Sequence, residues 1–427
     1  MKVLLAPAER ICSHNRMARK REKVSKKKLK RLKKQDMKGF KHFRILADLT
    51  EHLHEVYIDP KHPNKRKLHY DQYLSLMLLY MFSPICDSLR MVQQATELEK
   101  VQKLIGAPRF GRGTISDAGK IFNPELLKGI IGQLAEKVPD GPMGKLGRDD
   151  LDEIITLVDG SWLPGIVSML WANFRHDGPR RKAAKAHVQF ELAKGVPTAG
   201  KITDANTSEF STLQDMLQSG RLYVLDRGYA KYDLLQSIIE AKSGFVVRLH
   251  DNAVIEVQEE RELSDAALQA GVVRDAVVVL GQGKAKAKLK QPVRIVQVEC
   301  KEYRKPSGKT GRGGPEQGQT ILLGTSDLDL PPEIISMIYQ KRWAIEIFFR
   351  FFKQILGCRH LIHQSENGLE LQLYIAIIAC LLIAIYTGRK PNKAVLRLVQ
   401  FYLGGWATLE EVTRMIDRLP ESKQQTA

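Results

Sequence analysis

The sequence is short of cysteine and of long apolar runs. Its 427 residues include five cysteines without any CxxC pair, which argues against a disulfide scaffold or a structural zinc site and favours a reducing compartment. The most apolar run, residues 373–384, is far shorter than the roughly 20 residues of a membrane-spanning helix, so it predicts a buried core helix. No secretory signal is recognisable. We therefore expect a cytoplasmic protein with no membrane partner.

Acidic residues are also scarce relative to basic ones. The chain has 67 Lys and Arg against 48 Asp and Glu, a formal net charge of +19. Residues 1–45 hold 17 basic and three acidic residues, 17 − 3 = +14, so most of the excess lies in this segment. Such a charge indicates a polyanionic partner, in the first place nucleic acid. We expect residues 1–40 to form a disordered basic arm that contacts phosphates.

A nucleotide-binding loop is missing as well. The letters SGKT at residues 307–310 resemble the end of a phosphate-binding loop. Tyr303 stands where that motif requires glycine, and no switch from strand to helix follows. We therefore expect no nucleotide cofactor.

The pattern of apolar residues divides the chain into two kinds of structure. Helical spacing over residues 41–140 predicts an all-helical domain, which we expect to bind DNA beside the basic arm. After a Pro/Gly linker, short apolar runs alternate with helices, which predicts a mixed α/β sheet. The expected strands are 154–158, 162–171, 187–192, 222–225 and 245–249, and the expected helices between them are 211–218 and 232–241. Residues 250–325 are β-rich and look inserted, and residues 391–427 are expected to form a C-terminal helical tail.

Two aspartates follow predicted strands. Asp159 and Asp226 are each placed at the end of a short apolar run and before a glycine-containing turn, and strand ends are where an α/β sheet presents ligands. Neighbouring carboxylates repel unless a cation lies between them, and oxygen-only ligands suit Mg²⁺ or Mn²⁺. An ordinary turn role remains open for either residue taken alone. Asp204 and Glu209 are interpreted as turn and capping residues, since no strand end is predicted before them.

A single helix is predicted between Pro331 and Gly357, begun by proline and ended by glycine. At 100° per residue its polar side chains fall on one stripe 80° wide, while most of its girth is apolar. The residues of the stripe are Tyr339, Arg342, Glu346, Arg350 and Lys353. Burying these charges is costly unless they face a ligand-filled cleft, although a stripe that faces water is the alternative.

Together these motifs resemble the DDE transposases of insertion sequence family four. The resemblance rests on Asp159 in VDGS, Asp226 in LDRGY and the spacing Tyr-x2-Arg-x3-Glu-x6-Lys from Tyr339 to Lys353, which matches the YREK signature of that family. It covers about residues 45–390. It implies an α/β fold with a ribonuclease H-like mixed-sheet catalytic core at 150–390 and a β-rich insertion at 250–325, preceded by the all-helical domain.

The resemblance also implies cut-and-paste DNA transposition. Asp159, Asp226 and Glu346 would bind two Mg²⁺ or Mn²⁺ ions, a pair of metals suited to in-line phosphoryl displacement. Tyr339, Arg342 and Lys353 would hold terminal phosphates. The partners implied are the terminal inverted repeats, the target DNA and a second copy of the chain in the DNA end complex, on the bacterial nucleoid.

One more cation and one aromatic side chain on the predicted helix could contact DNA. Arg350 lies on the same side of the helix and can neutralise non-bridging phosphate oxygens. Trp343, beside the stripe, would stack on an unpaired base or else pack the helix edge.

Hairpin-forming members of the group use a tryptophan within the insertion to hold a flipped base. This insertion contains no tryptophan, so the sequence does not indicate a hairpin intermediate. Two other functions stay open: a transposase-derived protein that binds DNA without catalysis, and a ribonuclease H-like metal-dependent nuclease without strand transfer.

Overall fold

The structure is a computed structural model that describes residues 44–54, 56, 68–106, 108–141, 151–165, 168–174, 181–281, 289–300, 318–355 and 361–419. All of them belong to one unit, Gly39–Ala427. The basic arm at 1–40, the motif at 307–310, Tyr303 and Gly357 lie outside the described residues.

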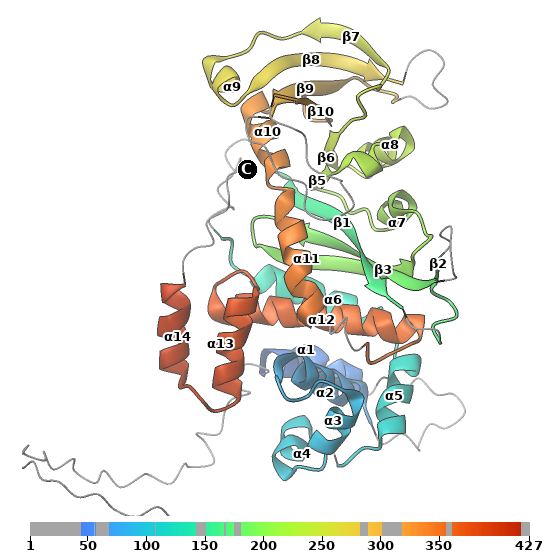
Figure 1. The fold of residues 1–427 in the computed structure, drawn as a ribbon, viewed down its shortest axis with the longest axis vertical. Coiled ribbons are helices and arrows are strands. Elements are labelled where there is room, and N and C mark those ends of the chain that lie inside the picture. The colour runs from blue at the N-terminus through green and yellow to red at the C-terminus, as the bar shows by residue number, and fades with distance from the viewer. Residues whose placement is uncertain are drawn as a thin grey trace, which may run out of the picture. The chain divides into compact units, whose positions relative to one another are not determined.

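Helices α1 to α6 precede the sheet (Figure 1). They are α1 Arg44–His54, α2 Tyr70–Phe82, α3 Leu89–Ala95, α4 Glu99–Ile105, α5 Arg112–Ile121 and α6 Leu126–Lys137. Helix α2 is apolar around most of its girth because it packs against α1, α5 and the later helix α12 (Glu366–Thr387) at once. The N-terminal helices and the C-terminal half of the chain therefore share one hydrophobic core.

The centre of the molecule is a mixed sheet. Its core strands are β1 Ile154–Pro164, β3 Arg181–Glu191, β4 Val196–Asp204, β5 Arg221–Leu225 and β6 Gly244–Arg248. They lie in the order β4-β3-β1-β5-β6, in which β3 is antiparallel to both β4 and β1, while β1, β5 and β6 are parallel to one another. This is the strand order of a ribonuclease H-like core, and it confirms the expected fold class.

Each face of the core sheet has its own apolar cover. One face joins the large cluster that contains α12 and the N-terminal helices. The other packs against α7 (Glu209–Asp215), the short 3₁₀ turn η3 (Arg227–Tyr229) and α8 (Tyr232–Glu240), which connect β4 to β5 and β5 to β6. The two-residue strand β2 (Asn173–Phe174) pairs with the start of β3.

The β-rich insertion extends the same sheet. It contains β7 Ile255–Glu260, α9 Asp265–Gln269, β8 Val272–Leu280, β9 Val293–Glu299 and β10 Thr320–Thr325. Strand β10 pairs antiparallel with β6, and β9, β8 and β7 follow in turn, as the yellow strands of Figure 1 show. A buried ion pair, Arg294 to Asp275 at 2.6 Å, satisfies both charges within it. Arg294 also donates to the carbonyl of Leu328, which fixes the insertion to the segment that leads into the next helix.

The strand predictions differ from the structure at three places. Strand β1 does not stop at Asp159 but continues to Pro164, because β3 pairs with it there. No separate strand spans 162–171, since residues 162–164 belong to β1 and residues 168–171 are not in a strand. Strand β4 was not predicted, and it contains Pro197 and Gly200, which are unfavourable in strands. Pro197 is tolerated at an irregularity of the pairing with β3. Gly200 lets α12 approach: a Cβ there would lie 3.0 Å from Leu373.

The helix predicted between Pro331 and Gly357 is interrupted. It consists of α10 (Pro332–Gln340) and α11 (Trp343–Ile355), joined by Lys341 and Arg342. At the joint the backbone changes to i→i+3 hydrogen bonds, from Arg342 to Tyr339 at 3.0 Å and from Ile345 to Arg342 at 3.2 Å. The tighter turn means that one helical wheel does not describe the entire stripe.

The apolar run at residues 373–384 lies inside α12, a buried core helix as predicted. Among the described helices α12 alone is long and apolar enough to cross a membrane, with a mean hydropathy of 2.3, yet 89% of that window is buried inside the protein. Its position between the sheet and α2 explains why it is apolar on every side (Figure 1).

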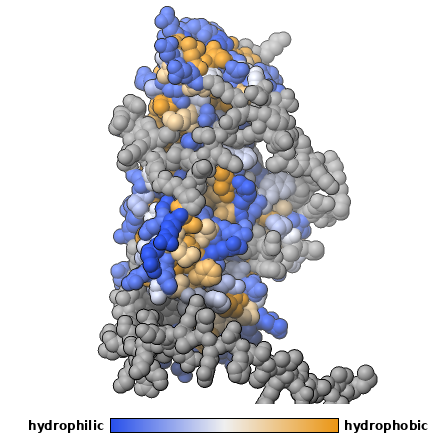
Figure 2. Space-filling view, turned by 60° about the vertical axis from the view of Figure 1, so that its left-hand side comes forward, coloured by the Kyte–Doolittle hydropathy of each residue, from blue (hydrophilic) through white to orange (hydrophobic). Residues whose placement is uncertain are grey.

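Two amphipathic helices follow α12. Helix α13 (Lys393–Leu403) and helix α14 (Leu409–Arg418) pack together through Leu398, Val412 and Ile416. Thr408 begins α14 with a capping box, in which its hydroxyl accepts from the Glu411 amide. Figure 2 brings the α14 side of Figure 1 forward and shows apolar residues grouped beside strongly hydrophilic ones.

A buried histidine fastens the N-terminal helices to the segment before α12. His363 Nε2 and the Tyr73 hydroxyl form a hydrogen bond of 2.7 Å, and His363 is 3% exposed. A Cβ at Gly119 would lie 2.3 Å from this ring, so only glycine fits there. Burial, helped by the charge of Lys120, lowers the pKa of His363 to about 4.

This histidine should make the fold acid-sensitive. Because its pKa is below the unfolded value of about 6.5, the unfolded chain takes up the proton first, and stability falls as the pH drops below 6.5. Between pH 6.5 and 4.5 the loss from this group is about 2 kcal/mol. We expect urea unfolding of His363→Gln, which keeps an acceptor for Tyr73, to show a correspondingly smaller loss than the wild-type protein. Equal losses in the two proteins would contradict the assignment.

Candidate active site

Asp159 and Asp226 lie side by side at one edge of the parallel strand pair. The last register pair of β1 and β5 is Leu157 with Val224, and each aspartate is two residues beyond its own member of that pair. Strand β5 ends at Leu225, so Asp226 is at a strand end as predicted, while Asp159 lies within β1. The arrangement brings the two carboxyl groups together even though the predicted end of β1 was wrong.

Backbone amides hold one oxygen of each carboxylate. The Gly160 amide donates to Asp159 Oδ1 at 2.8 Å, and the Gly228 amide donates to Asp226 Oδ1 at 2.8 Å. In both cases the bond fixes the side-chain rotamer and leaves Oδ2 without a hydrogen bond to the described residues. Two fixed carboxylates on adjacent strands can provide oxygen ligands for one divalent cation.

The third acidic residue approaches from α11. Glu346 lies in the first turn of this helix, which packs against β1. Its Oε1 accepts from Arg342 Nη2 at 2.7 Å, and both side chains are largely buried, at 19% exposure for Arg342 and 30% for Glu346. The interrupted helix thus delivers one cation and one carboxylate to the end of β1.

The electrostatics confirm that these side chains form one group. Burial, assisted by the charges of Asp226 and Glu209, raises the pKa of Asp159 to about 7 against the opposing effects of Arg342 and the Gly160 amide. Arg342 thus supplies positive charge to this group.

Tyr339 and a cation that the sequence analysis missed complete this side of the site. Burial raises the pKa of the half-buried Tyr339, and Arg342, Arg248 and Asp226 all act on it electrostatically. Arg248 is the last residue of β6, and its Nε is buried without a hydrogen-bond partner in the described part of the chain. Its sequence signal was available: a basic residue ends the strand next to β5.

The remaining predicted residues lie further along α11. Arg350 is exposed and Lys353 is half-buried, one and two turns beyond Glu346. No hydrogen bond or ion pair among the described residues joins either of them to the aspartates. Trp343 is 36% exposed at the start of the helix, next to Arg342. The structure therefore unites Asp159, Asp226, Glu346, Arg342 and Tyr339, and leaves these three residues on the flank.

The two spare carboxylates have different places. Asp204 caps its own turn, accepting from the Asn206 amide at 2.8 Å and from Thr207 Oγ1 at 2.6 Å, so the turn role is correct. It does end a strand, β4, which was not predicted. Glu209 at the start of α7 instead forms an ion pair with Lys185 at 3.1 Å and acts on Asp159.

The acidic group suits a divalent ion in its chemistry. Its donors are carboxylate oxygens, which Mg²⁺ and Mn²⁺ prefer, and burial together with two neighbouring carboxylates raises the pKa of Asp159, so a cation there would stabilise its ionised form. Among the described residues, no three His, Cys, Asp or Glu side chains are close enough to share one ion as they stand. Glu346 is engaged by Arg342, so it must release the guanidinium before it can take part.

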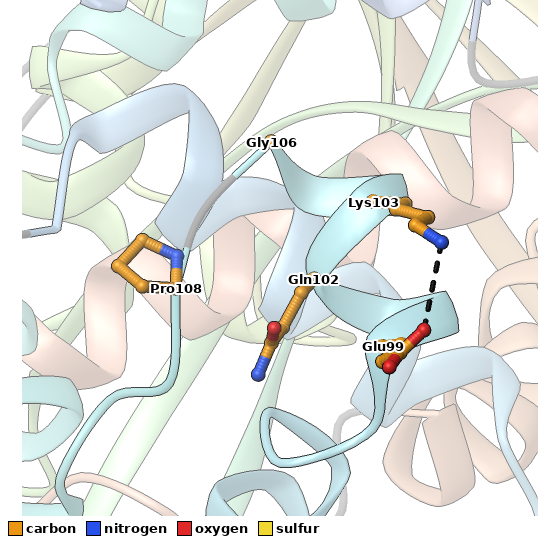
Figure 3. Close-up of a pocket in the computed structure, with 5 residues that line it drawn as sticks. All are labelled: Glu99, Gln102, Lys103, Gly106 and Pro108. Atoms are coloured by element: carbon orange, nitrogen blue, oxygen red, sulfur yellow. Dashed lines mark ion pairs between the residues drawn. The ribbon is translucent and has the colours of Figure 1, made fainter.

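A pocket of about 480 Å³ lies at α4, away from the acidic group (Figure 3). Its lining includes Gln102, Pro108 and an exposed ion pair of Lys103 with Glu99 at 3.6 Å. Gly106, with φ of 63°, ends α4 beside it in the left-handed conformation. One solvated ion pair provides no converging catalytic groups, so we assign this pocket no role.

Comparison with known proteins gives independent information on the family of this chain. The family model described as "Transposase DDE domain" matches residues 151–382. Relatives named as transposases include a protein of Sinorhizobium fredii, 28% identical over 61% of this chain and 68% of that one. Another, for an insertion sequence element of Geobacillus stearothermophilus, is 25% identical over 66% and 69% of the two chains.

Weaker likenesses exist to two further proteins. One is a transposase for an insertion sequence element of Synechocystis sp., 26% identical over 41% of this chain and 43% of that one. The other is the piggyBac transposase in a synaptic complex with hairpin DNA, with 9% identity and a TM-score of 0.38 over 82% of this chain and 73% of that one. Because the matched model covers more than half of the chain and contains all three acidic residues of the site, this protein belongs to the DDE transposase family.

Proposed function

We propose that this transposase binds the terminal inverted repeats of an insertion sequence and catalyses DNA cleavage and strand transfer with two Mg²⁺ or Mn²⁺ ions, in cut-and-paste transposition. The observation that carries the proposal is the pair of Asp159 and Asp226 at the end of the parallel strands, with Arg342 bonded to Glu346 and acting electrostatically on Asp159. In the DNA end complex we expect two copies of the chain, acting on the bacterial nucleoid.

Asp159, Asp226 and Glu346 would hold the ions. Two divalent ions bound there supply Lewis-acid stabilisation of the attacking and leaving oxygens of an in-line displacement. The contribution of the chain is to fix the ligands beforehand: amides of Gly160 and Gly228 orient the two aspartates. Preorganised charges of this kind are worth most in a site from which water is partly excluded.

The cations around the acidic group would bind the phosphates. Arg342 presents a planar guanidinium that can engage two phosphate oxygens, and Arg248 offers an unused buried Nε. Tyr339 can donate a hydrogen bond from the same side. Arg350 and Lys353 extend the positive line along α11, where a DNA backbone leaving the site would pass, and Trp343 could stack on an unpaired base.

The first prediction concerns the metal ligands. Asp159→Asn, Asp226→Asn and Glu346→Gln each remove a ligand charge and keep the side-chain shape, so we expect each to abolish cleavage of repeat-end DNA while end binding stays largely intact. The measurement is single-turnover cleavage and target joining in Mg²⁺, with Glu256→Gln on the exposed strand β7 as the control. Full cleavage by any of the three variants would refute the assignment, and cleavage without joining by the wild-type protein would indicate a nuclease.

The second prediction separates the two sides of the helix joint. We expect Arg342→Ala and Lys353→Ala to slow end cleavage ten- to a hundredfold, the loss of one charge-assisted contact of about 1.5–3 kcal/mol. Lys341→Ala should be nearly silent, because Lys341 lies near Lys390 rather than near the acidic group. Single-turnover rates at saturating Mg²⁺ test this. A Lys341 variant as slow as Arg342→Ala would mean that the stripe does not face the reaction.

The third prediction concerns the basic arm. Deleting residues 1–38 should weaken DNA binding regardless of DNA sequence. The reason is that Lys and Arg side chains attract the phosphates, which are the same in every sequence. The slope of log affinity against log salt should flatten by several units if several of its Lys and Arg contact phosphates. A titration series in 50–300 mM salt measures the slope, and an unchanged slope would exclude such contacts.

A further inference from the structure

A fourth carboxylate lies beside the three acidic residues of the site. Glu209 begins α7, directly after β4, and its side chain is about one-third exposed. Its negative charge acts on Asp159, raising the pKa of that residue. It reaches the site from the face of the sheet that α7 and α8 cover, whereas Glu346 comes from α11.

Gly160 makes this approach possible. It follows Asp159 in β1, and a Cβ on it would lie 3.0 Å from Glu209 Oε1 and 3.3 Å from Lys185 Cδ. The missing side chain therefore leaves the space that Glu209 and Lys185 occupy. The glycine that appeared in the sequence to end the strand instead admits a carboxylate next to Asp159.

An unpartnered buried hydroxyl is under the electrostatic influence of the same carboxylates. Tyr229, at the end of η3, is 1% exposed, and its hydroxyl has no hydrogen-bond partner among the described residues. Glu209, Asp159 and Asp226 all act electrostatically on this hydroxyl, with Glu209 the largest of the three. A buried O–H without a partner costs about 1–3 kcal/mol, so it indicates a group that the structure does not contain, such as an ion-bound water.

We propose that Glu209 is a fourth carboxylate of the divalent-cation centre, and that Tyr229 donates a hydrogen bond to the hydration shell of the ion. The proposal rests on the proposed function, since it places one more acidic residue at the same centre. Asp159, Asp226 and Glu209 all act electrostatically on the Tyr229 hydroxyl. Glu209 and Tyr229 would therefore contact an ion bound by the two aspartates through the water that the ion carries.

Lys185 sets how strongly Glu209 attracts an ion. Its ammonium is 3.1 Å from Glu209 and 5.8 Å from the centre of the Trp162 ring, and its side chain is 8% exposed. This cation compensates Glu209 while no ion is bound, and it competes with an ion for the same carboxylate. The two partners of the pair should therefore have opposite effects on cation affinity, which a purely structural ion pair would not have.

The test is Mn²⁺ binding by the full chain without DNA, measured by titration calorimetry and by the rise in melting temperature that Mn²⁺ produces. We expect Glu209→Gln to weaken Mn²⁺ binding three- to tenfold, Tyr229→Phe to weaken it two- to threefold, and Lys185→Met to strengthen it. The control is Asp215→Asn on the same helix, which breaks the surface pair of Asp215 with Lys201 (2.9 Å) and should leave Mn²⁺ binding unchanged.

The outcomes distinguish this inference from the function on which it rests. Unchanged Mn²⁺ affinity in Glu209→Gln, with only a lower melting temperature in the absence of metal, would make Glu209 a structural partner of Lys185 and overturn the inference. If Glu209→Gln does not fold, Lys185→Met decides alone, and equal or weaker binding than wild type overturns it. Wild-type protein that binds no Mn²⁺, or binds it equally after Asp159→Asn, would instead refute the metal centre itself.

Discussion

Repulsion between carboxylates on adjacent strands is the constraint on which the site depends. Parallel pairing of β1 with β5 forces Asp159 and Asp226 to lie side by side, and burial removes the water that would screen them. Such an arrangement requires a positive charge nearby. In the structure Arg342 provides this charge, and it opposes but does not cancel the effect of burial, so the pKa of Asp159 stays raised.

The interruption between α10 and α11 lies at the residue that supplies this charge. The backbone has i→i+3 hydrogen bonds at Arg342, whose guanidinium bonds to Glu346 and acts electrostatically on Asp159. The largely apolar girth of α11, with Phe348 and Phe352 buried, holds this end of the helix against β1. Packing on one side of the helix thereby fixes charges on the other.

The sequence predicted the types of residue in the site better than it predicted the lengths and breaks of the strands and helices. The ribonuclease H-like fold class, and the places of Asp226 at a strand end and of Glu346 on a helix, were predictable, because the motifs and the apolar periodicity report them directly. The true length of β1, the existence of β4 and the break in the long helix were not, because each depends on a partner elsewhere: β3, α12 and the acidic site itself. Glu209 was misread for the same reason, since its role arises from the side chain that Gly160 lacks.

Arg342 also couples the two parts of the proposed reaction. Its guanidinium bonds Glu346, and under the proposed function the same group would bind a phosphate. An ion at Glu346 would replace the guanidinium as the partner of that carboxylate, and a phosphate would replace Glu346 as the partner of the guanidinium. Binding of the ion alone would leave Arg342 without its carboxylate partner, and binding of the phosphate alone would leave Glu346 without its cation. When both bind, neither charge is left buried and unpaired. Metal and DNA binding should then be mutually favourable, a reciprocity required by thermodynamic linkage whichever ligand arrives first.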